Sequence, residues 1–153
     1  MGEIFGVIAS IGVVASLLVA SWQTRELTRQ TSLNNVMAGV SAMYNGMERL
    51  HHIDSFIAAE PWLYSHIYGG ASLPEDEDER ARVLAIAGML ADVADYGLVI
   101  TELNPGVQFY VGWRDFALSL RRTCPAMVQL VGEHSAWWSA LTKYWAEHPE
   151  PSA

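Results

Sequence analysis

A stretch of nineteen residues near the N-terminus, Ile4 to Trp22, carries no charged side chain, and this run limits the possible folds more than any other feature. As a helix rising about 1.5 Å per residue it reaches about 28 Å, close to the ~30 Å hydrocarbon core of a bilayer. Ten of its residues are Ile, Leu, Val or Phe, which favour insertion. We therefore expect a single transmembrane helix that contacts the lipid bilayer through residues 4–22.

Three other structures compete with a retained span. A cleaved signal peptide would end in small residues, as Ala20 and Ser21 are, but it would also begin with basic residues, and only Glu3 and the terminal amine precede this run. Cleavage of such a signal peptide would make the mature chain a secreted helical domain. A buried core helix rarely runs this long without a polar face, and an interfacial helix requires such a face.

Two arginines beside the run predict its orientation. Arg25 and Arg29 follow it closely, whereas no Lys or Arg precedes it. Positively charged residues gather on the cytoplasmic side of membrane spans. We expect a single-pass protein of the inner cell membrane, with the N-terminus outside and the C-terminal body in the cytoplasm.

Three small residues, Gly12, Ser16 and Ala20, lie four positions apart within the run. At this spacing they share one helix face, and small residues let two membrane helices approach closely. This face is the candidate site for packing between membrane helices.

Two later segments place apolar residues at alternating steps of three and four. The first comprises Leu33, Val36, Val40, Met43, Met47 and Leu50. The second comprises Val83, Ile86, Leu90, Val93, Gly97 and Ile100. This repeat is typical of helices that pack side by side, so an antiparallel pair is expected. Residues 23–35 contain no Pro or Gly, so the first helix either continues outward from the membrane or restarts at Ser32.

Shorter helices are expected in the rest of the body, separated by Pro and Gly, and no alternating pattern predicts a β-strand. The predicted fold class is all-α: a single N-terminal transmembrane helix followed by a four- to five-helix bundle. The predicted domains are an anchor over 1–22, the helical bundle over 23–148 and a flexible tail over 149–153.

Composition excludes several function classes. The chain has 9 Lys and Arg against 17 Asp and Glu, a formal net charge of −8, which argues against a nucleic-acid partner. Its one cysteine, Cys124, excludes an internal disulfide framework and a multi-cysteine zinc site.

Several stretches resemble a group of actinobacterial proteins of unknown function. They are QTRELTRQT at 23–31, RARVLAIAGMLADV at 80–93, Trp113 to Phe116, and the break at Pro125. The resemblance implies an N-terminal membrane anchor and a helical body. It implies no activity or cofactor that could be assigned to a residue.

One motif suggests chemistry. Glu48 and His51 share a helix face, as in the Glu-x-x-His motifs of di-iron bundles, and Asp92 or Asp95 on the partner helix could add oxygen ligands. Such bundles need two of these motifs, and this chain has one, so rim positions are the simpler interpretation and no cofactor is expected.

Two further groups are weaker candidates. The imidazoles of His51, His52 and His66 could converge on zinc if the 61–68 segment folds back. A reactive thiol at Cys124 would need a base, and His134 is the nearest in sequence, too far along one helix to reach it.

The densest aromatic cluster contains Trp137, Trp138 and Trp145. Core packing is its default role, and a partner-docking surface or membrane contact is the alternative. The leading hypothesis is therefore not an enzyme but a membrane-anchored interaction or scaffold module that binds a protein partner or itself. The alternative is a metal-binding or catalytic bundle that uses Glu48 and His51 with Asp92 or Asp95.

Overall fold

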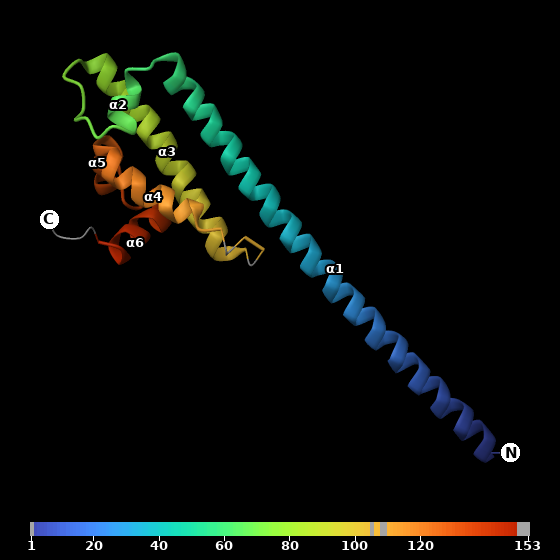
Figure 1. The fold of residues 1–153 in the computed structure, drawn as a ribbon. Helices are drawn as coiled ribbons and strands as arrows, with labels where there is room; N and C mark the ends of the chain where they lie inside the picture. The colour runs from blue at the N-terminus through green and yellow to red at the C-terminus, as the bar shows by residue number, and fades with distance from the viewer. Residues whose placement is uncertain (1, 105, 108–109, 150–153) are drawn as a thin grey trace.

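The computed structural model describes residues 2–104, 106–107 and 110–149, with side chains described from residue 12 onward. This described part is all-α: it contains six helices and no strand (Figure 1). The helices are α1 (Gly2–Ala59), α2 (Leu63–Ile67), α3 (Glu77–Leu103), α4 (Gly112–Thr123), α5 (Pro125–Glu133) and α6 (Ser139–Glu147). The predicted fold class is thus confirmed at the level of an all-α helical bundle.

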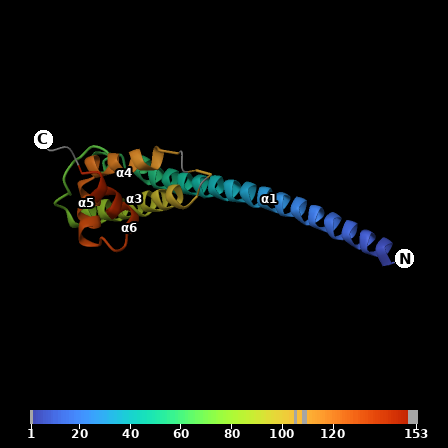
Figure 2. The ribbon, with the colours of Figure 1, turned by 90° about the horizontal axis from the view of Figure 1, so that it is seen from below.

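Helix α1 is one continuous helix of 58 residues. It passes through Ser32 without a restart, so continuation is the correct alternative of the two. At a rise of about 1.5 Å per residue it is about 87 Å long. Figures 1 and 2 show its C-terminal half lying along the bundle and its N-terminal half projecting away from every other helix. The helix also runs unbroken across the predicted boundary between residues 22 and 23.

Helix α3 is the centre of the bundle, since it contacts all five other helices. Its N-terminus is capped by Asp76, whose carboxylate accepts hydrogen bonds of 3.0 Å from the backbone N–H groups of Asp78 and Glu79. Small residues line its buried side, which lets neighbouring helices approach closely. They are Ala87, Ala91, Ala94 and Gly97.

Trp113, at the start of α4, fills the junction between α1 and α3. Its ring packs against Gly46 of α1 and Gly97 of α3, and a Cβ added at Gly46 would lie 2.9 Å from the ring carbon Cζ2. A Cβ added at Gly97 would overlap the same indole. Both glycines are therefore needed to make room for one large side chain.

The first predicted apolar seam is wrong in its N-terminal part. Leu33 and Val36 are exposed, whereas Met47 and Leu50 pack against the core. The residues of α1 that are buried are Gly39, Gly46, Ile53 and Ile57. The first contacts of α1 with the α3–α4 connection are at Asn35 and Val36. The seam is therefore covered only where helices of the bundle lie beside it, near its C-terminal end.

The final helix, α6, begins after two of the three tryptophans of the aromatic cluster. Trp137 and Trp138 lie in the turn before α6. They therefore do not lie on one helix with Leu141 and Trp145.

One helix within the described residues, α3, is long and apolar enough to cross a membrane. Half of its apolar window is buried inside the bundle, as expected for the core helix of a globular body. The predicted N-terminal span lies partly outside the residues with described side chains, because those of residues 2–11 are not described.

Candidate interaction surfaces

The projecting part of α1, defined as residues 12–38, is exposed at every position except Glu26, which is half-buried. Between residues 12 and 22 its apolar side chains have no other described helix to pack against. Leu18 and Trp22, for example, are 67% and 68% exposed. The other large apolar residues in the predicted span that lie bare are Val13, Val14, Leu17 and Val19. A continuous apolar surface of this kind marks contact with a membrane or another protein.

The small-residue face of Gly12, Ser16 and Ala20 is open. A Cβ added at Gly12 would meet nothing within 4 Å. The Ser16 hydroxyl donates a 2.8 Å hydrogen bond to the carbonyl oxygen of Gly12, one turn earlier. The face therefore carries no unsatisfied hydroxyl and offers space for a closely packed helix.

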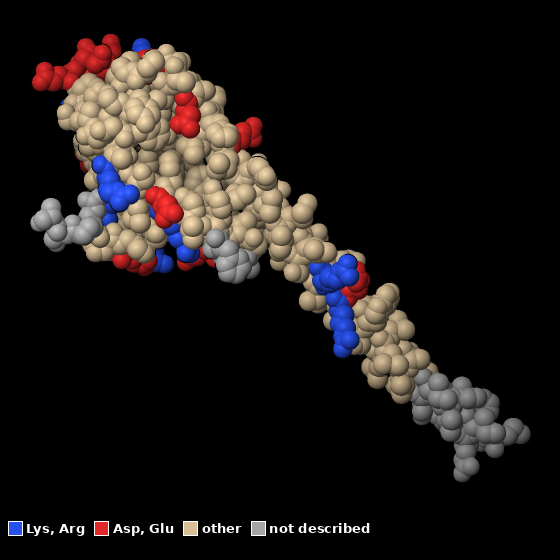
Figure 3. Space-filling view, in the orientation of Figure 1, with Lys and Arg blue, Asp and Glu red and all other residues tan. Residues whose placement is uncertain are grey.

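A single band of charge crosses the projecting part. Arg25, Glu26 and Arg29 are the only charged residues between positions 12 and 47. Figure 3 shows this band with uncharged surface on both sides. Glu26 accepts a 3.3 Å hydrogen bond from Gln30, and within the described residues none of the three charges forms an ion pair.

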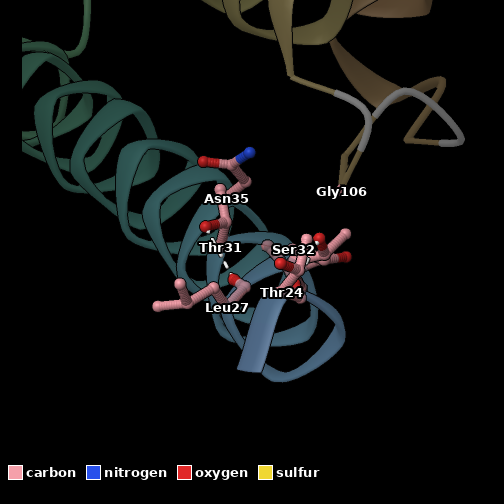
Figure 4. Close-up of a pocket in the computed structure, with 8 residues that line it drawn as sticks. Thr24, Leu27, Thr31, Ser32, Asn35 and Gly106 are labelled. Atoms are coloured by element: carbon pink, nitrogen blue, oxygen red, sulfur yellow. Dashed lines mark hydrogen bonds between the residues drawn. The ribbon is translucent and has the colours of Figure 1, made fainter. Parts of the chain in front are cut away.

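A hydroxyl-lined groove lies where the projecting part meets the α3–α4 connection (Figure 4). Its lining comprises Thr24, Leu27, Thr28, Thr31, Ser32, Asn35, Val36 and Gly106. The hydroxyls of Thr24, Thr28 and Thr31 each donate a 2.9 Å hydrogen bond to the carbonyl four residues earlier. These donors are satisfied within the helix, so they give the groove little capacity to hold a polar ligand.

The tryptophan cluster is mostly core. Trp138 and Trp145 are 5% and 6% exposed, and the Trp145 indole donates a 3.0 Å hydrogen bond to the carbonyl oxygen of Ala117. Trp137 differs, since it is 69% exposed and stacks on His134 with ring centroids 4.3 Å apart. Only Trp137 of the three predicted docking residues is therefore available on the surface.

Asp92 and Asp95 hold α6 against α3. The Asp92 carboxylate accepts a 2.7 Å hydrogen bond from the Trp138 indole. The Asp95 carboxylate accepts a 2.8 Å hydrogen bond from the backbone N–H of Leu141, near the start of α6. These two residues have a structural role that their spacing in the sequence does not reveal.

The residues proposed for metal chemistry share one open depression between α1 and α3. Glu48, His51, His52 and Asp92 all line it. Yet no three His, Cys, Asp or Glu side chains lie close enough to hold a metal ion anywhere in the described chain. His66 is occupied elsewhere, with its Nδ1 atom 2.6 Å from the carbonyl oxygen of Ser72.

Two titratable groups in the bundle, one buried and one half-buried, have raised pKa values. Burial raises the pKa of the Cys124 thiol, which is fully enclosed in the core and therefore stays protonated and unreactive at neutral pH. Burial, followed by a 2.9 Å hydrogen bond to the Asp54 carboxylate, raises the pKa of the Tyr68 hydroxyl well above its usual range. The Tyr68–Asp54 pair joins α1 to the segment after α2, and no sequence motif predicted it.

No family model, curated protein or solved structure matches this chain. The resemblance to membrane-anchored actinobacterial proteins therefore remains a prediction.

Proposed function

We propose that this chain is a single-pass, membrane-anchored helical module. Residues 4–22 would insert in the inner cell membrane, and the bundle would stand on its cytoplasmic face. The module is not an enzyme in this proposal. It binds a protein partner or a second copy of itself, and the resemblance to anchored helical proteins agrees with that architecture.

The observation that supports the anchor is the exposure of an apolar helix that projects away from its own bundle. Helices of globular bodies bury their apolar face, as the C-terminal half of α1 does. The projecting part instead leaves side chains such as Leu17 and Leu18 bare. Ten strongly apolar residues contribute about −0.3 to −0.6 kcal/mol each on insertion, or roughly −3 to −6 kcal/mol in total, and no charge opposes them.

The continuous helix would also set the distance of the bundle from the membrane. The first contacts between α1 and the α3–α4 connection are at Asn35, whose carbonyl accepts a 3.1 Å hydrogen bond from Asn104, and at Val36. Asn35 lies thirteen positions after Trp22, which is about 20 Å of helix. Arg25 and Arg29 lie within this interval, where the positive charges would meet the anionic headgroups.

Anchoring explains how a bundle without a catalytic site could act. Restricting molecules to one surface raises their local concentration, so a weak contact suffices for association. Among the bare surfaces available for that contact are the projecting part of α1 and the exposed Trp137.

Membrane fractionation of the full chain tests the anchor. The wild-type protein should stay in the membrane pellet after an alkaline carbonate wash. Replacing Val13 and Val14 with Arg should release it, because these residues lie at the middle of 4–22 and each charge costs about 2.5–3.5 kcal/mol at the centre of a span. Phe56→Arg is the control, since it changes an exposed apolar residue in the part of α1 that lies along the bundle. This variant should remain in the membrane pellet.

A wild-type chain found in the wash would refute the anchor. The intact mass of the pelleted protein separates a retained span from a cleaved one, since loss of residues through Ala20 or Ser21 would support the secreted alternative. A C-terminal reporter that is active only outside the cytoplasm should stay inactive if the proposed orientation is correct.

A further inference from the structure

A pocket lined by aromatic side chains lies between the C-terminal end of α1, the α2 segment and α4, and its volume is about 710 Å³. Tyr64, Tyr68 and Phe116 line this aromatic pocket. The apolar side chains of Leu50 and Ile57 also line it. Its size falls in the range of sites that hold a small molecule, and it is large enough for one long side chain of another protein.

One charged side chain lines the aromatic pocket, the carboxylate of Asp54. Its Oδ1 atom accepts a 2.9 Å hydrogen bond from the Tyr68 hydroxyl. An ionised carboxylate can accept about four hydrogen bonds, so most of this capacity stays open. Within the described residues Asp54 forms no ion pair. The pocket therefore combines aromatic rings with a single negative charge that no described side chain neutralises.

Two arginines of the bundle show both kinds of contact that a guanidinium group makes. Arg82 forms an ion pair of 2.6 Å with the Glu60 carboxylate. The Arg49 guanidinium lies over the Tyr96 ring, 5.2 Å from the ring centroid. Neither arginine lines the aromatic pocket. The cation that complements Asp54 must therefore come from another molecule.

We infer that the aromatic pocket binds an arginine side chain of a partner protein. This inference rests on the proposed function, since it names the chemistry by which the anchored module recognises its partner. A guanidinium group is planar: its faces stack on aromatic rings, and its edge donates paired hydrogen bonds to a carboxylate. The pocket offers both, with rings from Tyr64 and Phe116 and a carboxylate from Asp54.

Other organic cations match this combination less well. A quaternary ammonium ion binds over aromatic rings, but it has no N–H group to donate to Asp54. A lysine ammonium group donates hydrogen bonds, but it is compact and strongly hydrated, so apolar walls such as Leu50 and Ile57 favour it less. Of the three cations, only the guanidinium group uses both the rings and the carboxylate.

The position of the pocket favours a protein partner over a lipid headgroup. Figure 1 shows α2 at the end of the bundle that is farther from the N-terminus of α1. Asp54 lies thirty-two positions after Trp22, which is about 48 Å of helix. Even a helix tilted by about 40° would hold Asp54 about 37 Å above the end of the proposed span. The headgroup region extends only about 5–7 Å, so choline groups of the same membrane cannot reach the pocket.

Net charge favours a basic partner over a second copy of this chain. Each copy carries a formal net charge of −8, so two copies repel each other, whereas a basic segment is attracted. Two of the chain's own arginines are also engaged within one copy: Arg82 pairs with Glu60, and Arg121 donates a 2.7 Å hydrogen bond to the carbonyl oxygen of Trp145. The inferred partner is therefore a basic segment that presents an arginine.

An NMR titration of the full chain in neutral detergent micelles tests this inference. The probes are Nα-acetyl-arginine amide and its uncharged isostere, Nα-acetyl-citrulline amide. The arginine probe should bind about tenfold more tightly, because only its hydrogen bonds to Asp54 are assisted by charge on both sides. Equal binding of the two probes would overturn the inference. Tetramethylammonium that binds as tightly as the arginine probe would also overturn it, since the pocket would then be a site for quaternary ammonium ions.

Matched substitutions locate the binding. Asp54→Asn removes the charge but keeps an oxygen that can accept the hydrogen bond from Tyr68, and it should weaken binding of the arginine probe about tenfold. Asp115→Asn is the control, since it removes an exposed carboxylate next to Phe116 that does not line the pocket, and binding should not change. Equal weakening by both substitutions would show that the probe responds to net charge alone, and it would overturn the inference.

A ring substitution adds a second readout that does not depend on Asp54. Tyr64 is 60% exposed, so its replacement leaves the core intact. Tyr64→Leu should weaken binding of the arginine probe about threefold, because an aromatic face is lost. Tyr64→Phe keeps the ring and should bind as the wild type does. Wild-type affinity in Tyr64→Leu would contradict stacking in this pocket.

Membrane fractionation separates the failure of this inference from the failure of the proposed function. A chain that pellets with the membrane but does not distinguish arginine from citrulline would overturn the arginine pocket and leave the anchor intact. A chain that binds the arginine probe but is absent from the pellet would overturn the anchor and support the pocket. Dimers in micelles that the arginine probe disperses would assign the arginine to a second copy, and they would overturn the separate basic partner.

Discussion

The two halves of α1 belong to one unbroken helix, yet they present opposite surfaces. In residues 39–59 the apolar side chains Ile53 and Ile57 face the bundle, and charged or polar residues such as Glu48 and Arg49 face outward. In residues 12–22 the outward surface is itself apolar, and residues 23–38 are mostly polar, with charge limited to the band around Glu26. Figure 1 shows that the C-terminal half lies along the other helices and that the N-terminal half does not.

This contrast shows that helix continuity and burial are set separately. Helical propensity and the absence of Pro and Gly from residues 23–35 carry the helix through the whole region. Burial depends on what lies beside each turn. The bundle buries the apolar side chains of the C-terminal half of α1. The apolar side chains that the N-terminal half leaves exposed require a membrane or a partner to cover them.

The largest predicted effect comes from a substitution that destabilises the bundle and leaves the projecting part of α1 unchanged. Gly97→Ala inserts a methyl group into the Trp113 indole, between α3 and α4. Overpacking of a rigid core costs about 1–3 kcal/mol and sometimes more, and we expect the upper end because the indole is held between two helices. Thermal unfolding of the full chain in detergent micelles, followed by circular dichroism, measures the loss.

Gly88→Ala is the matched control on the same helix. A Cβ there would lie 4.0 Å from the Leu130 side chain, an ordinary contact. This change should be neutral or should raise stability by up to about 1 kcal/mol, because Ala favours the helix more than Gly does. Equal losses from both substitutions would contradict the role assigned to the Trp113 junction.

A second prediction concerns the contact between α6 and α3. Trp138→Phe and Asp92→Ala each remove one side of the 2.7 Å hydrogen bond between them. Asp92→Ala should lower the free energy of unfolding by about 1–2 kcal/mol, since the buried Trp138 indole is left without its partner. Trp138→Phe leaves the exposed Asp92 carboxylate free to bind water, so the loss of this hydrogen bond should cost less there. The double substitution should cost less than the sum of the two single ones, and a double-mutant cycle in chemical denaturation measures that coupling.

Strict additivity would show that Asp92 acts independently of Trp138. In that case its position in the depression with Glu48 and His51 would gain weight, and the alternative metal-binding function would have to be tested first by native mass spectrometry.

The sequence predicted the helical class and the approximate position of each helix, because Pro, Gly and apolar periodicity act locally. It could not predict which turns of the Leu33–Leu50 seam are covered. That outcome depends on the angle at which α3 and α4 meet α1, and this angle is set by Gly46, Gly97 and Trp113, three residues far apart in the chain.

The candidate surfaces were predictable to a smaller extent. The apolar run and its charged border are continuous in sequence, so they could be read directly. The roles of Asp92 and Asp95 could not, because their partners Trp138 and Leu141 lie 46 residues away. The separate locations of the tryptophans were not predictable either. A turn at 134–137 leaves Trp137 exposed on the surface and buries Trp138 in the core.

The smallest predicted effect is a loss of bundle stability at high pH, which the projecting part should not share. The pKa of Tyr68 is raised by burial and by Asp54, so the unfolded chain releases this proton first, near the ordinary value of about 10. Stability from this group is complete below pH ~10 and falls as the pH rises toward the folded pKa, by at most about 1.4 kcal/mol per pH unit. The raised pKa of Cys124 acts with the same sign from about pH 8.5 upward.

Tyr68→Phe isolates the tyrosine contribution. At pH 7 the variant should be about 1 kcal/mol less stable than the wild type, because it lacks the hydrogen bond to Asp54. Between pH 10 and pH 11 the difference in the free energy of unfolding should narrow. In this range the unfolded wild-type chain releases the Tyr68 proton while the folded chain retains it, so only the wild type loses stability from this group. Tyr64→Phe, which changes an exposed ring of α2 one turn before Tyr68, should follow the wild-type curve. A difference that stays constant with pH would mean that Tyr68 contributes packing alone, and that the contact between α1 and the segment after α2 does not depend on its hydroxyl.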